Sequence, residues 1–180
     1  MRDLIQEDIY NNSAWNQRWF VSHRGKQQKQ QQPLIGINAA RQEADFAISH
    51  GAMLDPYNES PWRYLIGILQ EQHRLCYTQK QQNNDNMATL IKRMIAEYEA
   101  KINSDDIRNV MIDANRNPDM CVHMTNARID LLEMIDTEDS LQMAITLAGG
   151  LATKFDTIRK KYWLLVSERM KRRISSKRST

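Results

Sequence analysis

The sequence has few of the residues on which several structural classes depend. Its 180 residues include only two cysteines, six glycines and four prolines. Two cysteines cannot build a disulfide framework, so we expect a protein of the reducing cytoplasm. The scarcity of glycine and proline excludes a turn-dense β architecture. No apolar run approaches the roughly 20 residues that cross a bilayer, and the polar N-terminus is unlike a signal peptide.

An excess of charge of one sign is also absent, except near the C-terminus. The chain has 25 Lys and Arg against 22 Asp and Glu, a net charge of +3. Six of the basic residues lie in 169–180, where there is no acid: Arg169, Lys171, Arg172, Arg173, Lys177 and Arg178. Basic tails bind nucleic acid or anionic membranes in some proteins. Because no aromatic residues alternate with these cations, we expect a solvated basic tail at 173–180, no nucleic-acid partner and no membrane insertion.

The sequence does contain strong helical periodicity. Apolar residues recur at three- and four-residue steps, for example at Met87, Leu90, Ile91, Met94 and Ile95. No segment shows the two-residue alternation of a strand, so the pattern predicts an all-α fold of amphipathic helices. Helices are predicted at residues 13–24, 38–54, 60–75, 86–102, 118–135, 138–154 and 156–172.

Helix-capping residues precede several of these segments. Ser60 followed by Pro61 is typical of an N-cap and a first helical position, and Asn117–Pro118 has the same chemistry. At the equivalent place near the N-terminus, Ser13 is the predicted cap. Thr137 and Asp156 are the predicted caps of the last two helices.

A phrase of eight residues occurs twice. Asp8–Trp15 and Asp55–Trp62 share Asp, Tyr, Asn, Ser and Trp in register, at an offset of 47 residues. A period of this size is typical of stacked helical hairpins, in which neighbours bury a continuous core. We therefore predict one repeat domain over residues 1–172, with units near 8–54, 55–102 and 115–154 and a final helix at 156–172.

The sequence of the repeat resembles that of a known protein family. Residues 11–21, NNSAWNQRWFV, resemble a repeat of protein prenyltransferase α subunits, whose pattern is a Trp followed three residues later by Arg, here Trp15 and Arg18. Residues 56–70 look like the next repeat, and residues 154–163, KFDTIRKKYW, are similar to the last helix. Because the three blocks follow one another in the same order as in the family, the resemblance is specific. The sequence resembles the α subunits shared by protein farnesyltransferase and type I geranylgeranyltransferase.

This resemblance implies a fold and a role. In the family the α subunit is a crescent of antiparallel helical hairpins, a right-handed α–α superhelix, which wraps around a β subunit. The β subunit holds the catalytic zinc and most of the isoprenoid and peptide pocket, and magnesium assists the farnesyl enzyme. The pair transfers farnesyl or geranylgeranyl from the isoprenyl diphosphate to the cysteine of a C-terminal CaaX motif. The implied partners are thus a β subunit and CaaX-type substrate proteins.

The sequence also departs from the family. The resemblance covers nearly the whole chain but only the C-terminal half of the family's subunit. The groups that the family's α subunit places near the substrates lie on earlier repeats, so the resemblance implies no catalytic residue and no cofactor in this chain. Leu65 stands where the second repeat has its Arg, and Gly149 and Gly150 replace ordinary helix formers. We expect a fragment of a longer subunit, with a truncated paralogue as the alternative.

The repeats supply the candidate interface residues. Trp15 and Arg18 share one helix face because they are three residues apart. We expect a structural role for the tryptophans, filling gaps between hairpins, and partner contacts from the asparagines of the preceding turns. The predicted partner-interface or repeat-motif residues are Asn11, Asn12, Trp15, Arg18, Asn58, Trp62 and Tyr64.

Two groups of residues have a faint metal-binding chemistry. His73, Cys76, Cys121 and His123 are zinc-competent side chains, but their spacing is not that of a closed zinc site. Asp105–Asp106 faintly resembles an acidic magnesium–diphosphate motif, yet acids are also favoured at helix N-termini. We therefore predict no metal site in this chain.

Two other functions fit a helical repeat. The chain is alternatively a stand-alone adaptor that binds peptides on a concave face, or the α subunit of Rab geranylgeranyltransferase. The block at residues 154–163 speaks against the latter.

In the last helix, Ile158, Tyr162 and Leu165 are predicted to face inward, with Arg159, Lys160 and Lys161 in solvent.

Overall fold

A computed structural model of the protein describes residues 2–24, 36–81, 85–107, 109 and 121–179. Within these ranges all regular structure is helical and no strand occurs, which confirms the all-α fold. None of the helices in this part of the chain is long and apolar enough to cross a membrane. Asn117 and Pro118, the predicted cap of the fifth helix, lie outside the described residues.

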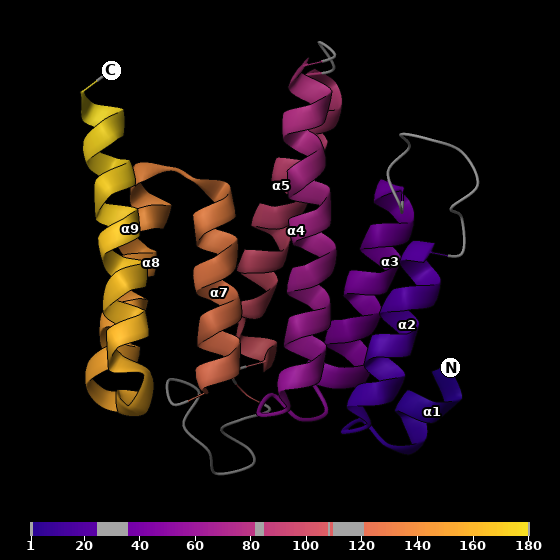
Figure 1. Cartoon of the computed structure of the whole chain (residues 1–180). Coiled ribbons are helices and arrows are strands. Elements are labelled where there is room, and N and C mark those ends of the chain that lie inside the picture. Colours follow the sequence, from indigo (N-terminus) through magenta and orange to yellow (C-terminus); the bar gives the residue numbers. More distant parts are fainter. Residues whose placement is uncertain (1, 25–35, 82–84, 108, 110–120, 180) are drawn as a thin grey trace. The chain divides into compact units, whose positions relative to one another are not determined.

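The chain forms two compact units, residues 1–94 and 95–180, and the boundary lies inside α5. The elements of the first unit are shown in indigo to magenta in Figure 1. In chain order they are α1 (Arg2–Glu7), α2 (Asn12–Arg24), α3 (Ile37–Ala47), a π-helical turn (Ile48–Ala52), α4 (Glu59–Gln81) and the first part of α5 (Asp85–Ile102).

Helix α4 is the centre of the first unit, because it packs against both α2 and α3. The face that α3 buries carries three small residues, Ala40, Ala44 and Ala47, which allow neighbouring helices a close approach. Trp15 of α2 and Trp62 of α4 are each 2% exposed and fill the larger spaces. Small residues on one helix and tryptophans on the others thus build this core.

The second unit consists of the end of α5, α7 (Val122–Ile135), α8 (Glu138–Gly150), a π-helical turn (Leu151–Phe155), a 3₁₀ turn (Thr157–Arg159) and α9 (Lys160–Arg178). Helices α7, α8 and α9 lie side by side (Figure 1). Their inward faces form one hydrophobic core around Ile129, Leu141, Ala148, Trp163 and Met170.

The caps of α2 and α4 differ from the prediction by two residues. The Asn11 side chain accepts a hydrogen bond from the backbone N–H of Ala14 at 3.0 Å, and that of Asn58 accepts one from Ser60 at 3.1 Å. The helices therefore begin at Asn12 and Glu59, before the predicted caps Ser13 and Ser60. Asparagine caps a helix as well as serine does, and here the earlier residue takes that position.

The caps of the last two helices have opposite outcomes. The cap at Thr137 is confirmed: its hydroxyl accepts from Ser140 N–H at 3.1 Å, and the Ser140 hydroxyl accepts from Thr137 N–H at 2.9 Å. The cap at Asp156 is wrong, because its carboxylate instead accepts the indole N–H of Trp163 at 2.8 Å and the Nε of Arg159 at 2.6 Å. A 3₁₀ turn follows Asp156, so α9 begins only at Lys160.

The last helix also buries a different face from the predicted one. Ile158, Tyr162 and Leu165 are 97%, 50% and 70% exposed, so the prediction that they face inward is wrong. The buried face instead carries Trp163, Val166, Ser167, Met170 and Ile174. Trp163, Val166, Met170 and Ile174 recur at steps of three and four residues, so they form the apolar stripe of α9, and the prediction chose another set.

The residues expected to form a basic tail continue α9 as far as Arg178. Arg173 pairs with Glu133 at 3.0 Å and with Asp136 at 2.8 Å, and Lys177 pairs with Asp136 at 3.0 Å. Arg178 pairs with Glu138. These cations thus hold the last turns of α9 to the end of α7 and the start of α8.

Candidate functional site

The repeated phrase builds the same local structure twice. The indole N–H of Trp15 donates to the Ile9 carbonyl at 2.9 Å, and that of Trp62 donates to the Pro56 carbonyl at 2.7 Å. In both copies the acceptor lies six residues before the tryptophan. A buried indole N–H needs a partner, and here the turn that precedes each helix supplies it. Each tryptophan therefore ties its helix to its own turn.

The aspartate and tyrosine of the phrase shape that turn. The Asp8 carboxylate accepts the backbone N–H of Tyr10 at 2.9 Å, and the Asp55 carboxylate accepts that of Tyr57 at the same distance. This is the Asx-type hydrogen bond by which aspartate stabilises turns. The shared residues of the two copies are thus explained by shared local contacts.

The two copies also contact each other. The Tyr10 hydroxyl donates to the Asp55 carboxylate at 2.6 Å, and the Asn58 side-chain amide donates to the Ile9 carbonyl at 2.7 Å. The Ile9 carbonyl therefore accepts from both Trp15 and Asn58. These bonds fix the start of α4 beside the start of α2.

A charged network joins α2, α3 and α4 one turn further along. The Arg18 guanidinium binds the Glu43 carboxylate in a bidentate way, at 2.7 and 3.0 Å, and lies over the Phe46 ring at 3.7 Å. The Tyr64 hydroxyl donates to the same carboxylate at 2.5 Å. Burial, and then the hydrogen bond to Glu43, raise the pKa of Tyr64 above its usual range. Tyr64 is therefore a neutral hydrogen-bond donor at physiological pH.

Sequence reasoning identified Arg18 and Tyr64 but missed Glu43. A signal was available, because Glu43 and Asp45 are the only acids in the predicted helix at 38–54. Of these, Glu43 lies three residues from Ala40 and four from Ala47, within the apolar stripe of that helix. An acid in an apolar stripe needs a partner, and Arg18 is that partner.

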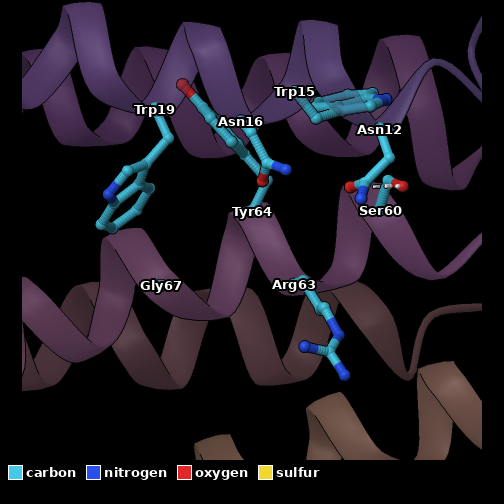
Figure 2. A pocket seen from close by; sticks show the side chains of 8 residues that line it. All are labelled: Asn12, Trp15, Asn16, Trp19, Ser60, Arg63, Tyr64 and Gly67. Carbon is cyan, nitrogen blue, oxygen red and sulfur yellow. Dashed lines mark hydrogen bonds between the residues drawn. The ribbon is translucent and has the colours of Figure 1, made fainter.

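A groove of about 240 Å³ lies between α2 and α4, next to this network. Figure 2 shows its lining: Asn12, Trp15, Asn16, Trp19, Ser60, Arg63, Tyr64 and Gly67. The three aromatic rings form its apolar part, with Tyr64 5.4 Å from Trp15 and 6.0 Å from Trp19 between ring centroids. The Ser60 hydroxyl approaches the Asn12 side-chain oxygen at 3.4 Å at one end.

Gly67 determines the shape of the other end of the groove. A Cβ atom at this position would lie 2.8 Å from the Trp19 ring. Only glycine lets this ring lie so close to α4, so residue 67 allows Trp19 to form one wall. The groove is thus built for an apolar group that contacts rings, with polar side chains along its edge.

The groove also has polar side chains that are exposed to solvent. Asn12 and Asn16 project from α2 and Arg63 from α4 (Figure 2), and all three are exposed. Arg63 pairs with Glu59 at 2.5 Å, but its side chain is 76% exposed. Side-chain amides donate hydrogen bonds to backbone carbonyls and accept them from backbone N–H groups, so this edge suits a polypeptide segment.

The predicted interface residues have two different environments. Trp15, Arg18, Asn58, Trp62 and Tyr64 are buried and bonded within the chain. Asn12 is exposed at the groove, and Asn11 is a partly exposed cap. The prediction missed Asn16, Trp19 and Arg63, which line the groove without belonging to the shared letters of the phrase.

The structure describes most of the residues with faint metal-binding chemistry. Within the described part of the chain, no three His, Cys, Asp or Glu side chains are placed to hold a metal ion. Cys121 is buried and its sulfur accepts the Met124 N–H at 3.5 Å as the cap of α7. Asp105 and Asp106 are exposed at the start of a short helical segment. The Cys76 side chain lies outside the described residues.

Comparison with known proteins places these features in a family context. No family model matches the chain. A pea (Pisum sativum) protein, protein farnesyltransferase/geranylgeranyltransferase type-1 subunit alpha, is 30% identical over 169 residues, which are 93% of this chain and 46% of the pea protein. The chain is therefore similar to a prenyltransferase α subunit over nearly all of its own length.

Two further α subunits of the same name agree. The Arabidopsis thaliana protein is 39% identical over 70 residues, 38% of this chain and 19% of its own length. The Dictyostelium discoideum protein is 24% identical over 160 residues, 89% of this chain and 40% of its own. The resemblance found in the sequence is therefore confirmed. The chain spans less than half the length of these prenyltransferase α subunits.

Proposed function

We propose that this chain is the α subunit of a heterodimeric protein prenyltransferase, or a part of it, and that it serves as a scaffold for a catalytic β subunit. The observation that carries this proposal is the identity to the pea α subunit across 93% of the chain. The turn contacts of the repeated phrase support it, because they explain why the phrase recurs as a structural unit.

The proposed division of labour leaves the chemistry to the β subunit. Zinc and magnesium belong to the β subunit and the assembled enzyme, which transfers farnesyl or geranylgeranyl to the cysteine of a CaaX-type substrate protein. We expect the isolated chain to be inactive. We place the pair in the cytoplasm, in keeping with the free thiol of Cys121.

The groove between α2 and α4 is the proposed contact site for the β subunit. Its aromatic walls accept an apolar side chain, and Asn12, Asn16 and Arg63 are placed to bind the polypeptide around it. Interface energy concentrates where aromatic and arginine side chains surround a pocket. Trp19 and Arg63 are the residues of this kind that the groove exposes.

Co-expression with the β subunit of the same organism tests the proposal. We expect co-purification at equal stoichiometry and transfer of a labelled isoprenyl group to a CaaX peptide by the pair, with no transfer by the chain alone. Replacing Asn16 and Arg63 by alanine is expected to weaken co-purification, since both line the groove.

A matched control replaces Gln17 and Gln70 by alanine, because both are exposed on the same two helices outside the groove. If the chain purifies as a soluble monomer and does not bind the β subunit, the result would favour the alternative of a stand-alone adaptor. Equal weakening by the control pair would remove the groove from the interface while leaving the subunit assignment in place.

A further inference from the structure

The start of α9 and the 3₁₀ turn before it carry an unusual concentration of exposed apolar side chains. Eleven large hydrophobic residues are exposed in the described part of the chain, and four of them lie between residues 158 and 165. Ile158 is 97% exposed, Leu165 70%, Tyr162 50% and Leu164 46%. We call these four residues the α9 ridge. Single exposed apolar residues are ordinary, but a cluster of this kind marks an interaction site.

The ridge is held outward by the packing behind it. Trp163, between Tyr162 and Leu164, is 1% exposed in the core of the second unit. Its indole N–H is also bonded to Asp156 at 2.8 Å. Rotation of α9 to hide the ridge would expose this tryptophan and break that bond. The ridge is therefore a fixed feature of the folded unit.

Positive charge accompanies the ridge. The only acids between residues 154 and 172, Asp156 and Glu168, are already paired with Arg159 and Lys171. Within the described residues, four other cations of this segment make no ion pair: Lys154, Lys160, Lys161 and Arg172. A ligand that matches the α9 ridge and these cations must therefore have both an apolar part and negative charge.

We propose that the α9 ridge docks the protein on an anionic lipid surface. Exposed apolar side chains accompanied by lysines are the features by which helical segments lie in a membrane interface, and the ridge offers both from the 3₁₀ turn and the first turns of α9. Lysine stems extend along the apolar boundary while their ammonium groups reach the lipid phosphates. The described helix would lie on the lipid surface and not across it, and the docking does not depend on the β subunit.

Co-sedimentation of the full chain with lipid vesicles tests this proposal. We expect binding to vesicles of phosphatidylcholine mixed with phosphatidylserine, little binding to phosphatidylcholine alone, and release by salt. Replacing Ile158 and Leu165 by serine is expected to weaken binding by roughly tenfold or more, because two apolar side chains no longer enter the lipid. Replacing Lys160 and Lys161 by glutamine is expected to have a similar effect.

Two control variants separate the ridge from general effects. Val21→Ser with Leu54→Ser removes two exposed apolar side chains elsewhere, and Lys92→Glu lowers the net charge by the same two units as the lysine pair. Both controls should bind vesicles as the unchanged chain does.

Three results would overturn the proposal. The first is equal binding to the two kinds of vesicle, and the second is equal loss in ridge and control variants. The third is self-association of the chain without vesicle binding, abolished by Ile158→Ser with Leu165→Ser, since the ridge would then be an interface between copies. Circular dichroism of each variant confirms that it is folded.

Discussion

Arg18 is a nearly buried cation, and its contribution to the free energy of unfolding can be measured. Its side chain is 10% exposed and its guanidinium is bonded twice to Glu43. Removing one partner of a buried ion pair leaves the other charge uncompensated. We expect Arg18→Ala to lower the free energy of unfolding by about 2–3 kcal/mol, measured by urea denaturation.

Arg63 provides the control for this prediction. It also pairs with a glutamate, Glu59, but its side chain is 76% exposed. Exposed ion pairs contribute little, so Arg63→Ala should change stability by less than about 0.5 kcal/mol. Similar losses for Arg18→Ala and Arg63→Ala would contradict the importance of burial.

Gly51 is required by close packing. A Cβ atom there would lie 2.5 Å from the Pro61 ring and 3.0 Å from Trp15, both of which are buried. Because neither ring can easily move, we expect Gly51→Ala to cost roughly 1–3 kcal/mol. Thermal unfolding followed by circular dichroism measures the change.

Gly149 is the opposite case, since nothing lies within 4 Å of the Cβ position that alanine would add in α8. Gly149→Ala should therefore stabilise the protein by about 0.5–1 kcal/mol, the usual gain of alanine over glycine in a helix. A loss of stability in this variant would show that the space around α8 is not open.

At the scale of elements, the sequence predicted most helices but not their ends. Apolar periodicity located α5 and α8 closely, because each has a clear stripe. It placed the end of α4 at residue 75, whereas the helix continues to Gln81. The last four of the added residues, 78–81, are all polar and add nothing to an apolar stripe, so periodicity could not detect them. Helix α1, of six residues, is too short for a periodic signal.

The candidate site was predictable to a smaller extent. The repeated phrase located the turns and the tryptophans, since these depend on local contacts. Glu43, Trp19 and Gly67 depend instead on which helices become neighbours, and the phrase does not contain them. The face of α9 was missed for a different reason. Trp163, Val166, Met170 and Ile174 recur at three- and four-residue steps, but so do Ile158, Tyr162 and Leu165, and only packing decides between the two sets.

The contact between α7 and α9 has a pH-sensitive component at Asp130. Burial, and then the charge of Glu133, raise the pKa of Asp130 from 3.8 to about 6, while the nearby Arg169 opposes the shift. The folded state therefore binds this proton more tightly than the unfolded state. The contribution of this carboxyl to stability thus falls as the pH rises from about 4 to about 6, and above that the ionised group is a constant cost.

Asp130→Asn removes this cost. We expect the variant to be more stable than the unchanged chain at pH 7, by roughly 1–3 kcal/mol. The difference should shrink toward zero below about pH 4, where the carboxyl is protonated in both states. Urea denaturation across this pH range measures it. A difference that is constant with pH would show that Asp130 ionises freely in the folded protein.

At the scale of the whole molecule, each of the two units has its own buried residues, and this predicts where a core defect is felt. Leu141, in the core of the second unit, is fully buried, as is Leu65 in the first. Either leucine replaced by alanine should cost about 2–5 kcal/mol. In helical repeats, contacts are mainly between neighbouring elements, so one part of the chain can open while the rest stays folded. Hydrogen exchange should therefore accelerate mainly in α7–α9 for Leu141→Ala and in α2–α4 for Leu65→Ala. Equal acceleration throughout the chain in both variants would mean that the two units unfold as one.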